Sequence, residues 1–230
     1  MVETIYIARH GYRLNWDTTI WKSETGLPRD PPLAAYGVSQ AEELAQHFLS
    51  LPEDERPTII FSSPYYRCLQ TARPVSKALG LPIYVEHGLS EWYSPTNLGH
   101  PFITLHEKEK TWMSVMTELE IFFMPCHAAT TIALTRELLG DRNIPLRVGC
   151  CSITEVKKKP DASTVLAGWE PKRLACGAHL KEGATRDWGF EDIVIADGKV
   201  VADPGQPGTE HEQDHPVGLQ LSEHEVVARM

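Results

Sequence analysis

Residues 4–11, Thr4-Ile5-Tyr6-Ile7-Ala8-Arg9-His10-Gly11, join a short apolar run to a tripeptide of a different character. The run is rich in β-branched and aromatic side chains, which predicts a buried strand that opens into a loop at Arg9. In open α/β sheets, functional sites form where the strands end. We therefore expect Arg9 and His10 to lie at the carboxyl edge of a sheet.

Strand and helix patterns then alternate along the chain. Further strands are expected at residues 58–61, 82–85 and 121–124, with β-like character again at 146–156. Helices are expected after a capping box of Ser39 and Glu42, at about 66–79 and at 128–139. This alternation predicts an α/β fold, a three-layer sandwich with a mostly parallel central sheet and helices on both faces.

The C-terminal part differs in composition from the rest. Residues 146–202 are β-rich and contain Asp197-Gly198, a typical hairpin turn, so we expect them to extend the domain formed by residues 1–202. Residues 203–230 carry six acids and one arginine among many polar side chains. That composition predicts a solvated, disordered acidic tail.

Charge and cysteine content narrow the classes of function. The formal net charge of −9 argues against direct nucleic-acid binding, because phosphate backbones attract basic surfaces. The five cysteines are odd in number and lack metal-ligand spacing, which favours reduced thiols inside the cell, in cytoplasm or nucleus. The N-terminus has no signal-peptide pattern and no run is long and apolar enough to span a membrane, so no membrane association is expected.

Reactive side chains follow four of the predicted strands. In chain order they are Arg9, His10 and Arg13, then Arg67, then Glu91, and finally His127. A neutral imidazole is a competent nucleophile near pH 7, and the planar fork of arginine binds phosphate oxygens in pairs. A carboxylic acid can protonate a leaving oxygen. Together these groups favour phosphoryl transfer that needs neither a metal nor a cofactor.

Arg9-His10-Gly11 after a strand resembles the signature of the histidine phosphatase superfamily, whose fold is phosphoglycerate mutase-like. Four further blocks follow in the order of that family. They are Asp30-Pro31-Pro32-Leu33 with Gly37 and Gln40-Ala41, Ser62-Ser63-Pro64 with Arg67 and Gln70-Thr71-Ala72, Gly88-Leu89-Ser90-Glu91-Trp92, and His127-Ala128-Ala129. Arg13 and Glu91-Trp92 look closest to the Sts/TULA-type phosphatases, and the histidine-phosphatase domain of the tau-55 subunit of transcription factor IIIC is similar.

The resemblance assigns an expected role to each matching residue. His10 would be the phosphorylated nucleophile, with Glu91 as the general acid and later the base for water. The residues expected to hold the phosphate are Arg9, Arg13, Arg67 and His127. The implied activity is metal-independent hydrolysis of a phosphomonoester, carried by a small molecule or a phosphoprotein.

Two departures from the family leave a second reading open. The segment of residues 95–126 is shorter than the corresponding segment of the family, which usually carries a cap over the pocket. Pro125 removes a backbone donor just before His127. The alternative is a phosphate-binding or assembly module of low activity, such as a tau-55-like subunit. In that reading the β-rich residues 146–202 would bind a protein partner.

Overall fold

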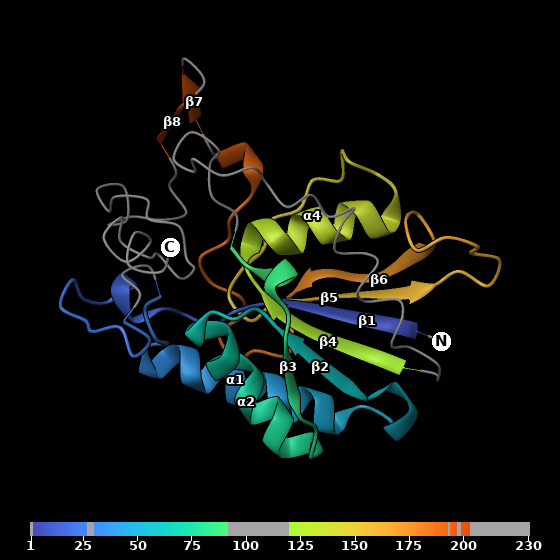
Figure 1. Ribbon diagram of the computed structural model, residues 1–230, viewed down its shortest axis with the longest axis horizontal. Coiled ribbons are helices and arrows are strands. Elements are labelled where there is room, and N and C mark those ends of the chain that lie inside the picture. The colour runs from blue at the N-terminus through green and yellow to red at the C-terminus, as the bar shows by residue number, and fades with distance from the viewer. Residues whose placement is uncertain (1, 27–29, 92–119, 193, 197–198, 203–230) are drawn as a thin grey trace, which may run out of the picture.

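A computed structural model describes residues 2–26, 30–91, 120–192, 194–196 and 199–202 (Figure 1). The central sheet contains six strands in the order β3-β2-β4-β1-β5-β6. They are β1 (Val2–Arg9), β2 (Ile59–Ser62), β3 (Ile83–Val85), β4 (Glu120–Cys126), β5 (Ile153–Lys158) and β6 (Trp169–Cys176). The first four run parallel, whereas β5 is antiparallel to β1 and β6 is antiparallel to β5. The predicted mostly parallel sheet is confirmed.

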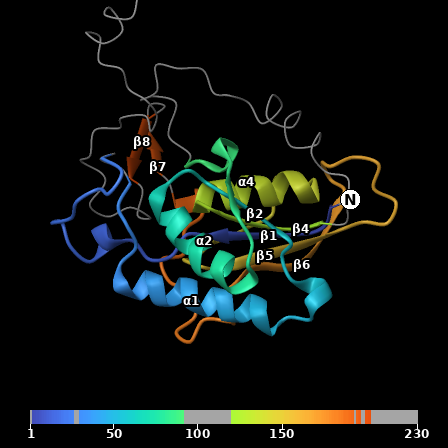
Figure 2. The ribbon, with the colours of Figure 1, turned by 60° about the horizontal axis from the view of Figure 1, so that its bottom comes forward.

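Helices cover both faces of this sheet, as the sequence predicts. Helices α1 (Ala35–Ser50) and α2 (Tyr66–Leu79) lie together on one face, and α4 (Ala128–Leu139) lies on the other (Figures 1 and 2). The boundaries of α2 and α4 agree with the sequence pattern, because each helix ends at a glycine, Gly80 or Gly140, in the left-handed conformation.

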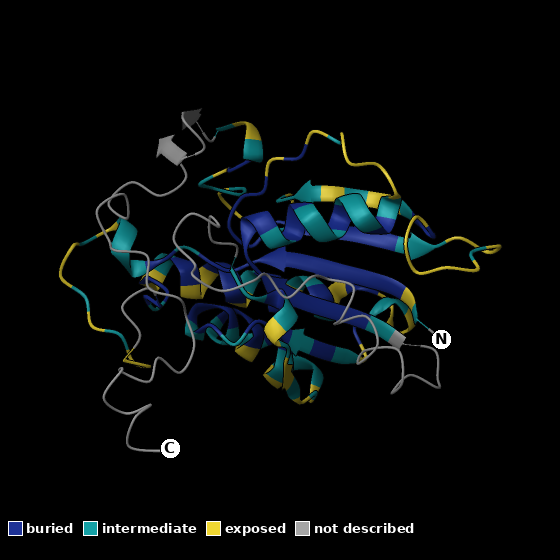
Figure 3. Cartoon of the chain, turned by 45° about the horizontal axis from the view of Figure 1, so that its top comes forward, coloured by how far each residue is buried: buried dark blue, intermediate teal, exposed yellow. Residues whose placement is uncertain are grey.

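The two central strands, β1 and β4, are buried on both sides (Figure 3). On the α1 side, the ring of Phe48 lies 5.2 Å from Tyr6 and 4.8 Å from Phe123, centroid to centroid. Ile5 and Ile7 point to the opposite face and pack against the cluster that contains Met124. Alternate residues of β1 therefore serve two cores, which fixes the register of the strand and the position of its last residues.

The expected start of α1 is wrong. The helix begins at Ala35, one turn before the proposed capping box, and Ala34 is its N-cap without a side-chain cap. Ser39 lies inside the helix, where its hydroxyl donates to the carbonyl of Ala35 at 3.3 Å. The serine and the glutamate that follows it three residues later therefore lie inside the helix and do not cap it.

The strand expected at 146–156 is only partly correct. Residues 146–152 form no named strand, although Val148 makes an isolated bridge with Trp188, and β5 begins at Ile153. Strand β6 was not expected, because its exposed lysine and arginine side chains break the apolar alternation that marks a strand. It is the outer strand on this side of the sheet.

A second, two-stranded sheet follows near the C-terminus. Strands β7 (Val194–Ala196) and β8 (Lys199–Ala202) pair antiparallel, as expected, while their turn residues lie outside the described residues. The acidic tail predicted at 203–230 also lies outside them. Within the described residues, no helix combines the length and the apolar character that crossing a membrane requires.

Candidate active site

His10 follows the last residue of β1 and is 1% exposed. Its backbone N–H donates to the carbonyl of Cys126 at 2.9 Å, and its Nδ1 lies 2.8 Å from the carbonyl oxygen of Gly11. A carbonyl only accepts, so Nδ1 carries the proton and the lone pair belongs to Nε2. Burial, with the nearby charges of Arg67 and Arg9, holds the pKa of His10 well below its usual value and keeps the ring neutral.

Gly11 is required by close packing behind His10. A Cβ at this position would lie 2.6 Å from the carbonyl oxygen of Gly37, so neither chain could approach as it does with a larger residue. The N–H of Gly11 donates to Thr71 Oγ1 at 3.0 Å. The next N–H, of Tyr12, donates to Gln40 Oε1 at 3.0 Å. Side chains of α1 and α2 therefore fix the loop that holds His10.

His127 follows β4, the neighbour of β1, and is fully buried. Its ring lies 5.5 Å from that of His10, centroid to centroid. Nε2 lies 2.9 Å from Ser63 Oγ, and Nδ1 lies 3.1 Å from Glu91 Oε2. Burial lowers the pKa of His127 to about 4, although the Glu91 carboxylate opposes this shift. The ring is neutral at neutral pH. Nδ1 also lies 3.1 Å from Arg67 Nη2, and in the tautomer with the proton on Nδ1 the ring donates to the Glu91 carboxylate.

Arg67, on the first turn of α2, is the charged centre of the site. Its guanidinium is 1% exposed and lies 3.4 Å from both Asp30 Oδ1 and Glu91 Oε2. Asp30 also accepts the backbone N–H of Tyr66, at 3.0 Å through Oδ1 and 2.9 Å through Oδ2. The same carboxylate therefore caps α2 and orients Arg67. Asp30 belongs to a block that the sequence analysis quotes, but no role was predicted for it.

Arg9 and Arg13 are each 4% exposed and complete the charged surface around His10. Arg9 donates through Nη1 to the carbonyls of Val148, at 2.8 Å, and Arg186. Arg13 lies over the ring of Trp16 at 4.3 Å, and burial, Arg67 and Arg9 lower its pKa to about 9, which leaves it charged at neutral pH. We call Arg9, Arg13 and Arg67 the arginine floor of the site.

Three buried donors of this region lack an acceptor among the described residues. They are Arg9 Nε, Arg13 Nε and Trp16 Nε1. Buried donors are nearly always satisfied, and an unsatisfied one costs free energy. Their grouping around the neutral imidazole of His10 indicates a site for an anion rich in oxygen acceptors.

Glu91 closes the site from the loop after the short 3₁₀ helix His87–Leu89, and its side chain is 11% exposed. Burial alone would raise the pKa of this carboxyl, but His127 and Arg67 outweigh it and lower the pKa to about 2. Glu91 is therefore ionised in the ligand-free protein. A bound phosphate dianion would offset the arginine charges and raise the pKa of Glu91, so that the carboxyl group could be protonated and donate a proton.

A cation fits this place less well than an anion does. The ligand atoms of His10, Glu91 and His127 lie within 4.8 Å of one another, a spacing that a metal ion accepts. However, the charges of Arg67, Arg9 and Arg13 all disfavour a positive charge at His10, so the arginine floor repels a cation there. The donor set therefore matches a phosphate group better than a metal.

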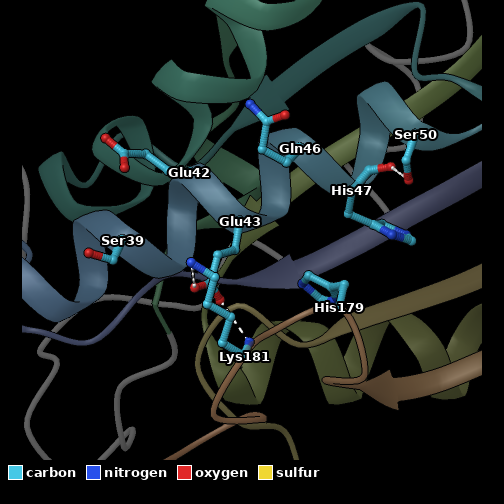
Figure 4. Close-up of a pocket in the computed structure, with 8 residues that line it drawn as sticks. All are labelled: Ser39, Glu42, Glu43, Gln46, His47, Ser50, His179 and Lys181. Carbon is cyan, nitrogen blue, oxygen red and sulfur yellow. Dashed lines mark hydrogen bonds and ion pairs between the residues drawn. The ribbon is translucent and has the colours of Figure 1, made fainter.

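The structure brings together all six side chains that the sequence singled out. Asp30, Ser63 and Trp16 contact these side chains, and the backbone carbonyl of Arg186 accepts a hydrogen bond from Arg9, yet no role was predicted for any of the four from the sequence. Cys126, beside His127, is a neutral thiol: burial raises its pKa to about 12, and its Sγ lies 3.3 Å from Thr131 Oγ1. A separate groove of about 630 Å³ runs along the outer side of α1 and contains none of these residues (Figure 4).

The model of the histidine phosphatase superfamily (branch 1) matches residues 5–126, which is just over half of the chain. The chain belongs to the histidine phosphatase superfamily. The match ends one residue before His127, so the second histidine is placed by the structure alone.

Two curated relatives match parts of this superfamily member. The transcription factor tau 55 kDa subunit of Saccharomyces cerevisiae is 52% identical over 97 residues, which are 41% of this chain and 22% of the relative. The mouse ubiquitin-associated and SH3 domain-containing protein A is 31% identical over 111 residues, which are 44% of this chain and 18% of the relative. The matches thus span about a fifth of each relative.

Solved structures support the fold. A phosphoserine phosphatase from Entamoeba histolytica, in complex with 3-phosphoglyceric acid, has a TM-score of 0.55 at 18% identity and covers 78% of this chain and all of that one. A mycobacterial glucosyl-3-phosphoglycerate phosphatase has a TM-score of 0.54 at 16% identity and covers 75% of this chain and 98% of its own. At these identities the likeness establishes the architecture and not the substrate.

Proposed function

We propose that the chain hydrolyses phosphomonoesters through a phosphohistidine on His10, without a metal. The observation that carries this proposal is the state of His10. Its Nδ1 is committed to the carbonyl of Gly11, which leaves the Nε2 lone pair for attack beside the arginine floor and its unused donors. Membership of the superfamily supports the same chemistry.

The reaction then proceeds in two displacements. His10 Nε2 attacks phosphorus, the bond to the leaving oxygen breaks, and protonated Glu91 gives that oxygen its proton. Arg9, Arg13 and Arg67 hold the phosphoryl oxygens throughout, and the Nδ1–H of His127 donates to them in place of Glu91. In the second step Glu91 accepts a proton from water, which attacks phosphorus and releases phosphate and free His10.

The test is turnover of an aryl phosphate by three proteins: the wild type, His10→Ala and His47→Ala. His47 is a histidine of the separate α1 groove, so its substitution controls for loss of any imidazole (Figure 4). We expect His10→Ala to lower turnover by at least about 10⁴-fold, while His47→Ala and EDTA leave it within about twofold. Turnover that survives His10→Ala, or that EDTA abolishes, would contradict the mechanism.

We infer a second candidate function, assembly, from one relative. The yeast protein that is 52% identical over 97 residues is named as a subunit of a transcription factor. In this reading the domain binds phosphate with little turnover, acts in the nucleus, and contacts a partner through residues 146–202. Purification of the native protein with its partners tests it, and an active monomer without partners would contradict it.

A further inference from the structure

Arg186 supplies a fourth guanidinium beside the site, from the segment between β6 and β7. Its Cζ lies 5.2 Å from the ring centroid of Trp16 and 5.6 Å from that of Tyr12, and its Nη2 lies 3.5 Å from the Tyr12 hydroxyl. The Trp16 ring in turn lies 6.2 Å from the ring of His10. Unlike the arginine floor, Arg186 is only half-buried, so its charge reaches the solvent side of the pocket.

The backbone around Arg186 is fixed before any ligand binds. Its carbonyl accepts a hydrogen bond from Arg9 Nη1, and the preceding carbonyl, of Thr185, accepts from the N–H of Cys150 at 2.8 Å. Arg186 itself has φ 56°, a left-handed conformation that non-glycine residues adopt at a cost. Such conformations persist where the surroundings impose them, and they are concentrated at functional sites.

The charge of Arg186 is not balanced by a carboxylate within the described part of the protein. No carboxylate there lies within ion-pair distance of it, whereas both carboxylates of the site, Asp30 and Glu91, pair with Arg67. The phosphoryl group is already served by the arginine floor and His127. An additional, half-exposed guanidinium, stacked on two aromatic rings, therefore suits a different anionic group.

We propose that Arg186 binds a second negatively charged group of the substrate, close to the phosphoester. The preferred substrate is then a phosphomonoester that also carries a carboxylate or a second phosphate. The rings of Tyr12 and Trp16 limit the orientations of the guanidinium, so less side-chain entropy is lost when the anion binds. This inference rests on the proposed function, because it places a phosphoryl group over His10.

Two non-hydrolysable probes test the proposal by calorimetry at low salt: benzylphosphonate and 4-carboxybenzylphosphonate. In the wild type we expect the carboxylate to tighten binding about tenfold. Arg186→Asn should remove that advantage and leave benzylphosphonate binding within about twofold, since asparagine tolerates a positive φ. Arg147→Asn is the matched control, because Arg147 is exposed and pairs with Asp192 at 2.6 Å.

Phosphonate peptides with glutamate or glutamine beside the phosphonate form a second arm. A preference for the glutamate peptide alone assigns the second group to a protein substrate, and a preference for the small probe alone assigns it to a small acid; either supports the proposal. Equal binding of the acidic and neutral probes by the wild type, or a preference that survives Arg186→Asn, overturns it alone. Failure of the wild type to bind benzylphosphonate overturns the proposed function as well.

Discussion

The ends of β1 and β4 lie side by side, and each delivers a buried histidine, but the two rings are fixed in different ways. His10 is oriented by the carbonyl of the next residue, Gly11. His127 is oriented by Ser63 on one ring nitrogen and by Glu91 on the other, from 64 and 36 positions away in the chain. The imidazole ring of His10 is thus oriented by a neighbouring backbone group, and the ring of His127 by tertiary contacts.

This difference explains what the sequence predicts and what it does not. Arg9-His10-Gly11 predicts the strand end that carries the histidine, and the carbonyl that orients its ring in the structure belongs to the same tripeptide. The orientation of the His127 ring requires the ends of β2 and β4 to lie side by side, and Arg186 contacts Arg9 from 177 positions away in the chain. Ser63 lies in a quoted motif block, but nothing local predicts its contact with His127, and no local pattern marks Arg186. Neither contact could be found before the fold was known.

Pro125 shows how the sheet accommodates an apparent break in the pattern. The residue pairs with Ala8 of β1, and its carbonyl accepts the N–H of Ser63 at 3.2 Å. The missing donor falls near the end of β4, after the strand has paired with β2 at Phe122 and Phe123. His127 consequently emerges beside His10 despite a proline in a central strand.

The largest expected effect is a loss of rate that distinguishes substitution of Glu91 from substitution of its partner His127. An alkyl alcohol needs a proton to leave, whereas nitrophenolate does not, and general acid catalysis contributes about 10²–10⁴-fold when the proton is needed. Glu91→Gln should therefore slow alkyl phosphates by that factor and nitrophenyl phosphate far less. His127→Ala should slow both alike, because in the proposed mechanism His127 contacts the transferred group.

Single-turnover formation of phospho-His10 is the measurement, since in the proposed mechanism Glu91 also activates water in the second step. Measuring this step alone keeps the difference between the two substrates visible even when dephosphorylation limits the overall rate. Equal losses for both substrates in Glu91→Gln would remove Glu91 from the acid role. A loss confined to alkyl phosphates in His127→Ala would assign the proton to His127 instead.

The acid stability of the fold tests whether both rings are neutral. Burial lowers the pKa of each histidine, of His127 to about 4, while histidines of the unfolded chain titrate near 6.5. Below about pH 6.5 the unfolded state binds more protons than the native state, so the free energy of unfolding decreases as the pH is lowered. For His127 the loss is about 2 kcal/mol between pH 6.5 and 5.

Urea unfolding of the wild type, His10→Gln and His127→Gln at pH 7 and pH 5 measures this difference. Each substitution should flatten the decline of unfolding free energy toward pH 5, although each also changes the absolute stability. If the decline in His127→Gln parallels that of the wild type, then His127 is charged in the native state. The same outcome for His10→Gln would mean that the nucleophile is protonated at pH 5.

The smallest expected effect concerns the hydroxyl that orients His127. Nδ1 lies 3.1 Å from Glu91 Oε2, which only accepts, and 3.1 Å from Arg67 Nη2, which only donates. With the proton on Nδ1, the ring donates to Glu91 and Nε2 accepts from Ser63 Oγ–H, whereas in the opposite tautomer Nδ1 accepts from Arg67. Ser63→Ala leaves Nε2 buried with only the weak donor Cys68 Sγ, 3.6 Å away. The opposite tautomer then becomes accessible, and we expect kcat to fall about tenfold while KM changes little.

Ser62→Ala is the matched control, since Ser62 is equally buried but donates to the carbonyl of Ser63 and not to the imidazole. ¹⁵N chemical shifts of His127 report the tautomer directly, a readout that a general loss of packing would not move. The Nδ1–H form should dominate in the wild type and in Ser62→Ala, and the Nε2–H form should gain population in Ser63→Ala. An unchanged tautomer together with a lower kcat would mean that Ser63 acts by packing, and that His127 is oriented by Glu91 and Arg67 alone.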